Sequence, residues 1–119
     1  MPRKVPHFPD CDLRQMGVAT GACLATDRIV VDGCKVGYCY REPPESEDDS
    51  GWRFFAGDEE PAYLADEDNL GLYEVNTIAN YDEAIIGVLD FPVGSAFRRA
   101  PLGGFEPAPL LRPDATTQA

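Results

Sequence analysis

The sequence predicts a single α+β domain in which a mixed, mainly antiparallel sheet is accompanied by two short helices and flanked by proline-rich terminal arms. A chain of 119 residues fits one domain of ordinary size. Two segments, centred on Tyr38 and on Trp52, alternate apolar and polar residues with the period of a half-buried strand. Helix signals, by contrast, are confined to two short segments.

The prolines divide the chain into a body and two arms. They are frequent before Cys11 and after Ala100, and proline resists regular secondary structure. We therefore expect a proline-rich N-terminal arm at residues 1–15, a folded domain over residues 16–105 and a proline-rich, partly disordered C-terminal tail at residues 106–119.

The first part of the body is predicted to form strands. Residues 22–25 and 28–31 are short apolar runs, and Asp32-Gly33 is typical of a two-residue hairpin turn because glycine tolerates a positive φ. The return strand is expected over residues 34–41. Alternation along it places Cys34, Val36, Tyr38 and Tyr40 on one face and Lys35, Gly37, Cys39 and Arg41 on the other.

A second strand is expected over residues 51–57. Trp52, Phe54 and Ala56 share its apolar face, which leaves Arg53 and Phe55 on the other face. We therefore expect Phe55 to be half-exposed and available as an anchor for a partner.

Three basic side chains gather on one surface if these two strands pair, namely Lys35, Arg41 and Arg53. The simplest interpretation is that they form cross-strand salt bridges, which contribute little near a surface. The alternative is an anion-binding site, because a planar guanidinium binds a carboxylate or phosphate in bidentate fashion.

The segment after residue 57 begins with a short helix. Acidic residues followed by a proline predict a helix over residues 61–65. A loop is expected over residues 66–71 and a brief strand over residues 72–75.

The last part of the body is predicted to be one helix and one edge strand. Asn80, with a glutamate three residues later, is typical of a helix start, so we expect a helix over residues 82–89. A strand is expected at a sheet edge over residues 95–99, followed by a turn at Gly103-Gly104. The buried stripe of the helix is expected to be Ile85, Ile86 and Leu89.

The charge of the chain is strongly negative. Its 21 acidic and 10 basic residues give a formal charge of −11, which disfavours nucleic acid because binding a phosphate backbone generally requires Lys and Arg. The acids are concentrated between Glu42 and Asp68. They form either a solvated surface that keeps the protein soluble or a docking face for a basic partner. The residues expected to contact such a partner are Glu42, Glu45, Glu47, Asp48, Asp49, Phe55, Asp58, Glu59 and Glu60.

Catalytic and metal-binding chemistry finds little support in the sequence. His7 is the single histidine and lies in the N-terminal arm, the four cysteines lack zinc-ligand spacing, and the glycines form no phosphate-binding pattern. We therefore expect no enzyme activity, no metal and no cofactor, with four reduced thiols. Asp49 and Asp58 are interpreted as loop or helix caps rather than as paired catalytic acids.

The apolar runs are far shorter than the roughly 20 residues of a membrane span, and no secretory signal is recognisable. We therefore expect a cytoplasmic protein without a membrane partner. A free edge strand leaves open whether it is a monomer or a weak homodimer.

Three stretches of the sequence resemble the immunity protein 33 domain, a small bacterial family. They are DGCKVGYCYRE from Asp32, DSGWRFFAGD from Asp49 and NTIANYD from Asn76. The resemblance runs from about Ala22 to Arg98. The proline-rich arms and Cys39, where the family usually has a bulkier apolar residue, depart from the pattern.

The resemblance implies a non-enzymatic protein that binds a cognate toxin and blocks it inside the producing cell. In this hypothesis the acidic segments cover a basic active-site cleft of the toxin. The alternative is a stand-alone cytoplasmic protein that binds a small anion or has a regulatory role through Lys35, Arg41 and Arg53. An uncharacterised enzyme is a third and weaker hypothesis.

Overall fold

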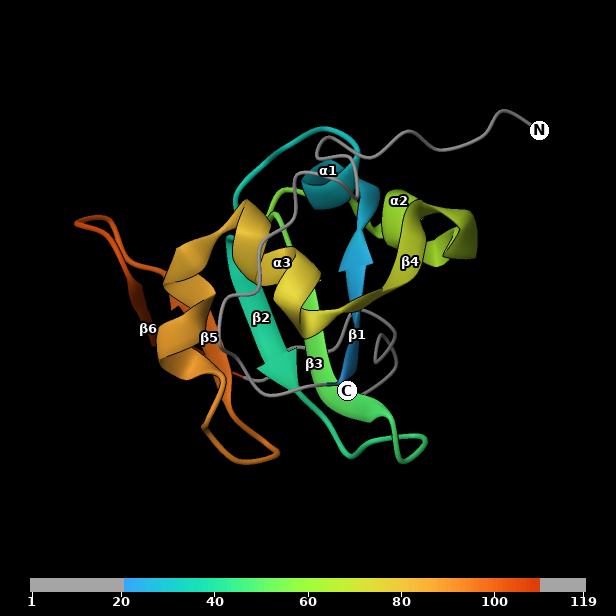
Figure 1. Cartoon of the computed structure of the whole chain (residues 1–119). Coiled ribbons are helices and arrows are strands. Elements are labelled where there is room, and N and C mark those ends of the chain that lie inside the picture. The colour runs from blue at the N-terminus through green and yellow to red at the C-terminus, as the bar shows by residue number, and fades with distance from the viewer. Residues whose placement is uncertain (1–20, 110–119) are drawn as a thin grey trace.

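The computed structural model describes residues 21–109, so the arm expected at residues 1–15 and the end of the tail expected at residues 106–119 lie outside the described residues. A six-stranded sheet with the order β4-β1-β3-β2-β5-β6 organises the described chain (Figure 1). The strands are β1 (Ala22–Thr26), β2 (Tyr38–Arg41), β3 (Asp49–Phe55), β4 (Leu70–Glu74), β5 (Ala96–Arg99) and β6 (Phe105–Pro107).

The sheet is mixed and mainly antiparallel, as the sequence predicts. Only the β1–β3 pair is parallel among the strand pairs of residues 21–109. The helical elements are all short: α1 (Asp27–Val30), α2 (Pro61–Ala65), α3 (Val75–Tyr81) and two 3-10 helices, η2 (Glu67–Asn69) and η3 (Glu83–Val88). The predicted α+β fold class is thus confirmed.

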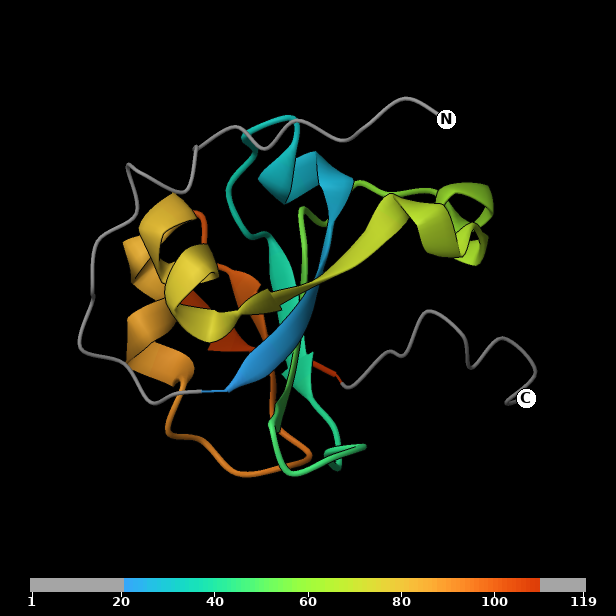
Figure 2. The same ribbon diagram turned by 45° about the vertical axis from the view of Figure 1, so that its right-hand side comes forward.

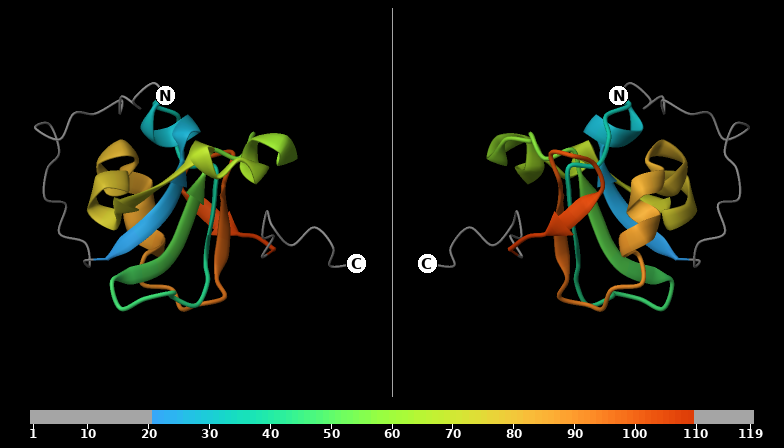
Figure 3. Two further views of the ribbon diagram at one scale, coloured as in Figure 1. Left: turned by 90° about the vertical axis from the view of Figure 1, so that its right-hand side faces the viewer. Right: turned by 90° about the vertical axis from the view of Figure 1, so that its left-hand side faces the viewer.

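The helices are divided between the two sides of the sheet. Figure 3 shows α3 and η3 on one side and α2 on the other. Strand β4 runs from the α2 side to α3, as Figure 2 shows. Each sheet face therefore has a different cover.

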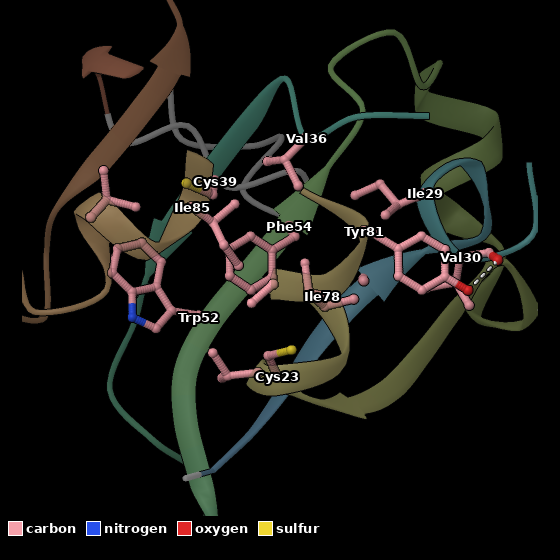
Figure 4. Close-up of a cluster of buried hydrophobic side chains, with 14 of the residues drawn as sticks. Cys23, Ile29, Val30, Val36, Cys39, Trp52, Phe54, Ile78, Tyr81 and Ile85 are labelled. Carbon is pink, nitrogen blue, oxygen red and sulfur yellow. Dashed lines mark hydrogen bonds between the residues drawn. The ribbon is translucent and has the colours of Figure 1, made fainter. Parts of the chain in front are cut away.

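The main core lies between the sheet and α3, η3 and α1 (Figure 4). Trp52 and Phe54 of β3 are fully buried there and stack with ring centroids 6.0 Å apart. The Tyr81 hydroxyl donates a hydrogen bond to the Val30 carbonyl (3.0 Å), so the one polar atom of that ring is satisfied inside the core. The buried thiol of Cys39 also faces this core.

The other sheet face carries a smaller cluster of aromatic and aliphatic side chains. Tyr40, Phe55 and Ala96 are buried in it, and Tyr38, Leu64 and Leu70 pack against them. The predicted alternation along the second strand is confirmed, because Trp52 and Phe54 lie in the main core while Phe55 lies in this second cluster. The helix predicted over residues 61–65 is also confirmed, as α2.

The strand predicted over residues 28–31 is wrong, because this segment continues α1. Backbone bonds from Val31 and Asp32 to the Asp27 carbonyl close a helical turn (2.8 and 2.9 Å). The consecutive apolar residues of this segment do not alternate with polar ones, so the hydrophobic pattern does not distinguish a strand from a helix. A single turn of helix lets Ile29 and Val30 both enter the core.

The hairpin predicted at Asp32-Gly33 is also wrong. Residues 33–37 are not a strand, and β2 begins only at Tyr38. Val36 consequently lies in the main core, whereas Tyr38 and Tyr40 belong to the opposite face. The predicted shared face of Val36, Tyr38 and Tyr40 is therefore wrong, because alternation applies only to a continuous strand and residues 33–37 do not form one.

The predicted helix over residues 82–89 is displaced. Residues 75–81 form α3, in which the Asn80 amide donates to the Asn76 carbonyl (2.8 Å), and Asp82 begins η3 by accepting from the Ala84 N–H (3.1 Å). The three-residue period of η3 buries Ile85 with Val88 and leaves Ile86 38% exposed, so Ile86 is not part of a buried stripe. Strand β5 is not an edge, because β6 pairs outside it.

Candidate partner-binding surface

A buried arginine organises the end of the sheet where β2 and β3 are joined. Arg53, on β3, is 3% exposed. Its guanidinium binds Asp49 through two parallel hydrogen bonds (2.9 and 2.8 Å) and donates from Nε to Glu42 (2.5 Å). This arrangement gives the strong bidentate geometry of an arginine–carboxylate pair. Hydrogen bonding from Arg53 holds the pKa of the Asp49 carboxyl well below its usual range.

Asp49 also fixes the backbone of the loop that precedes it. Its carboxylate accepts the N–H groups of Glu45 and Gly51, both at 2.9 Å. Gly51 has φ +89°, and a Cβ there would lie 2.2 Å from the Glu42 carbonyl oxygen, so only glycine fits. The interpretation of Asp49 as a loop cap is confirmed.

The β2–β3 connection, Glu42 to Asp48, is called the acidic loop. Glu45, Glu47 and Asp48 are exposed, and within residues 21–109 their side chains form no hydrogen bond or ion pair. The loop therefore presents three solvated carboxylates on a base that Arg53 and Asp49 hold in place.

In the second acidic segment, Asp58 and Glu59 have partners within the fold. Asp58 pairs with Arg28 (2.5 Å), an exposed contact that lowers the pKa of Asp58 through hydrogen bonding. Glu59 accepts from the Thr26 hydroxyl (2.5 Å) and from the backbone N–H of Ala56 (2.7 Å). Of the three acids expected to contact a partner here, only Glu60 is left exposed without a side-chain bond in the described chain.

A groove of about 400 Å³ lies on the sheet face opposite α3, and we call it the open-face groove. It extends between the acidic loop, which precedes β3, and α2, which follows it; the two lie at opposite ends of that strand (Figure 1). Its apolar lining consists of Leu24, Tyr40, Phe55, Pro61, Leu64, Ala65 and Leu70.

The charged lining of the open-face groove comes from Glu42, Glu45 and Arg53. Phe55 is 6% exposed and stacks on Tyr40, with centroids 5.7 Å apart. The expectation that Phe55 is half-exposed is therefore wrong, because α2 and the neighbouring ring cover it. It belongs to the wall of a groove rather than projecting from the surface.

A smaller hollow of about 190 Å³ lies on the other side of the acidic loop. Glu47 and Asp48 line it together with Arg41 and Trp52. The free carboxylates of the loop are thus divided, with Glu45 at the open-face groove and the other two at this hollow.

The expected gathering of Lys35, Arg41 and Arg53 is not observed. The β2–β3 register pairs Arg41 with Trp52, so Arg41 and Arg53 lie on opposite faces of the sheet. Arg41 donates to the carbonyls of Ser50 and Phe91 (2.9 and 2.7 Å), and the Lys35 amine donates to the Tyr81 carbonyl (2.9 Å). The register therefore separates Arg53 from Arg41, whereas Lys35 lies before β2 and outside the strand pair.

One buried polar network has no counterpart in the sequence predictions. Asp82 is 4% exposed and accepts from Arg99 and from the Val36 N–H (3.0 Å), while Arg99 Nε donates to the Val36 carbonyl (2.9 Å). The guanidinium also lies 4.8 Å from the centroid of Phe105. This network fastens β5 to the start of η3 and acts structurally. The only sequence signal for it is the position of Asp82 at the end of NTIANYD.

Residues 21–109 offer little support for metal binding or for thiol chemistry. No group of three or more His, Cys, Asp or Glu side chains there is arranged to hold a metal ion. Cys23, Cys34 and Cys39 are free thiols, and burial raises the pKa of Cys39 to about 12. A buried thiol with a raised pKa is a poor nucleophile. Within the same residues, no helix is both long and apolar enough to cross a membrane.

Comparison with known proteins identifies one family. The sequence model of the immunity protein Imm33 domain matches residues 23–108, which is more than half of the chain. Searches of the curated proteins and of the solved structures found no match.

Proposed function

Because this chain belongs to the Imm33 family of immunity protein domains, we propose that it binds a cognate toxin and neutralises it in a stoichiometric complex. The proposed toxin presents a basic surface, and the immunity protein covers it without any chemistry of its own. The proposed site of action is the cytoplasm of the bacterium that produces the toxin.

The observation that supports this proposal most directly is that some acids at the β2–β3 connection are bound inside the fold while others face solvent. Arg53 binds Glu42 and Asp49 internally, whereas Glu45, Glu47 and Asp48 are solvated. A charged loop with a fixed base loses little conformational freedom when it binds, which favours affinity. A negative field of this kind also raises the association rate with a basic partner.

Inhibition follows from competition for the same charges. A toxin that acts on an anionic substrate needs a basic cleft, and carboxylates placed in that cleft occupy the cations that the substrate requires. The net charge of −11 extends the attraction beyond the contact itself. Two of the internally bonded acids, Glu42 and Asp49, would then hold the loop at its base.

The test is co-expression with the candidate toxin encoded beside the gene for this chain, followed by titration calorimetry of the purified proteins. We expect growth to be rescued and a 1:1 complex to form. The Glu47→Lys/Asp48→Lys double variant should slow association at low salt by tenfold or more, with a smaller difference at high salt because exposed charges are screened.

The matched control reverses two exposed acids that line neither the groove nor the hollow, Glu67 and Glu83, which carry no side-chain ion pair in the described residues. This Glu67→Lys/Glu83→Lys variant has the same net charge as the loop variant, so it isolates position from total charge. Equal weakening by both pairs would show that the loop is not the contact. Absence of any complex with neighbouring gene products would overturn the function itself.

A further inference from the structure

The open-face groove has the properties of a recognition site and has no role in the proposal above. Its volume of about 400 Å³ lies at the small end of the range for ligand sites, which is about 300–1,000 Å³. Most of its lining is aliphatic or aromatic. A groove of this size and composition suits one or two side chains rather than a large ligand.

The charged residues around the groove favour an occupant with a positive charge. Arg53 is its one basic lining residue, and four of its hydrogen bonds already go to Glu42, Asp49 and the Trp52 carbonyl. A guanidinium has five N–H donors, so little capacity remains for an incoming anion. Two carboxylates, those of Glu42 and Asp49, bind this single cation, and Glu45 adds a third carboxylate to the groove, so negative charge is in excess.

The aromatic residues that line the groove also favour a positively charged occupant. Tyr40 and Phe55 both line the groove and stack on each other, and aromatic rings of this kind can attract a cation and pack against aliphatic carbon. Glu45, which lines the groove, is exposed and has no side-chain partner in residues 21–109. An arginine or lysine has the apolar stem and the terminal charge that such a site can bind.

We propose that the open-face groove receives an arginine or lysine of the toxin together with an apolar side chain next to it. This inference rests on the proposed function, since it assigns the anchor point of the same complex. The basic head lies against Glu45, and the apolar stem and its neighbour lie against Phe55 and Leu64. The acidic loop attracts the partner, and the groove holds it.

Two substitutions on α2 test the groove without touching the acidic loop. Ala65 is exposed and lines the groove, whereas Ala62 is exposed on the same helix and does not line it. Ala65→Trp should fill the groove and weaken the toxin complex by at least tenfold, mainly through faster dissociation. Ala62→Trp, the matched control, should change the affinity by less than about twofold.

A second pair of variants tests the charge. Glu45→Gln removes the carboxylate at the groove, and Glu47→Gln removes a neighbouring one outside it. We expect Glu45→Gln to weaken the complex by three- to tenfold and Glu47→Gln to change it less. Equal effects of the two variants would contradict the assignment of the basic head to Glu45.

A probe experiment on the free protein does not depend on the toxin. The peptides acetyl-Leu-Arg-Leu-amide and acetyl-Leu-Glu-Leu-amide are titrated into the ¹⁵N-labelled full chain. The arginine peptide should shift the amide signals of Phe55 and Leu64 saturably, at a concentration at least five times lower than the glutamate peptide. Equal shifts with both peptides, or none with either, would refute the preference for a cation.

The outcomes separate the inference from the proposed function. If the toxin binds wild type, Ala65→Trp and Ala62→Trp equally, the groove is not the anchor, although the immunity function stands. If truncation after Pro109 shifts the groove signals of the free protein, the occupant is the chain's own C-terminal segment and the inference is wrong. It is equally wrong if those signals depend on protein concentration, because the occupant is then a second copy.

Discussion

Replacement of Asp49 by asparagine is the most informative single change at the base of the acidic loop. The substitution keeps the size of the side chain but removes its charge and one of its two acceptor oxygens. The remaining oxygen must then serve either Arg53 or the backbone N–H groups of Glu45 and Gly51. The amide N–H groups of the new asparagine would also lie next to N–H donors, with which they cannot form hydrogen bonds. Arg53 keeps Glu42 as its one charged partner.

The cost follows from the burial of the pair. Arg53 and Asp49 have side chains only 3% and 9% exposed, and removing one partner of a buried pair costs about 3–5 kcal/mol. Because Glu42 still binds the Nε atom, we expect the lower end, about 3 kcal/mol. That loss is a large fraction of the roughly 5–15 kcal/mol of a typical domain. At about 4–8 °C per kcal/mol for a domain of up to 100 residues, the melting temperature falls by roughly 12–24 °C.

The effect should depend on pH with a definite sign. Arg53 lowers the pKa of Asp49 in the folded state below the ordinary value of 3.8. A carboxyl with a lowered folded pKa contributes stability that is fully present above its unfolded pKa and is lost as the pH falls through the folded value. The stability difference between wild type and Asp49→Asn should therefore be constant from pH 5 to pH 7 and narrow below about pH 4.

Urea denaturation followed by tryptophan fluorescence measures this difference, because Trp52 is buried and is the single tryptophan. Glu47→Gln is the control, since it changes an exposed carboxylate of the same loop and should stay within about 0.5 kcal/mol of wild type. Asp49→Asn with wild-type stability at pH 7 would refute the reasoning. So would a stability difference that widens in acid.

Three further predictions concern the scaffold around this site. In a variant whose N-terminal arm cysteine is replaced by serine, Ellman's reagent at pH 8 should titrate Cys34 rapidly and reach Cys39 only after unfolding, because burial raises the pKa of Cys39 to about 12; rapid reaction of all thiols would contradict this. Gly51→Ala should cost more than about 1 kcal/mol in urea denaturation, since its φ is positive; wild-type stability would show that the loop has an alternative path. Asp82→Asn should cost about 1.5–3 kcal/mol by weakening its bond to Arg99, and a neutral result would assign that network no structural role.

The sequence predicts the strand around Trp52 and fails where the period is ambiguous; the alternation over residues 34–37 also misleads, because these residues form no strand. The segment around Trp52 has large aromatic residues at every second position, and the structure places them as expected. The consecutive apolar residues Ile29 and Val30 have no such period, and one turn of α1 buries both. The boundary of α3 was missed for a related reason, because Asp82 begins a different helical element.

The candidate site was only partly predictable because register is a long-range property. The sequence shows that acids gather between Glu42 and Asp68 but does not show which of them Arg53 binds. That pairing depends on the β2–β3 register, and a shift by one residue would turn Arg53 toward the main core. The groove depends further on where α2 packs, which no local pattern between Pro61 and Ala65 encodes.

The role of Arg53 connects stability with recognition at this end of the sheet. Five acids lie between Glu42 and Asp49, and without a buried cation their mutual repulsion would favour an open and variable loop. Arg53 binds the first and the last of them and so leaves the middle three facing solvent. The same guanidinium forms part of the open-face groove, where its bound carboxylates keep the site negative. A single buried arginine therefore holds the acidic loop in place without cancelling the charge that we propose the toxin recognises.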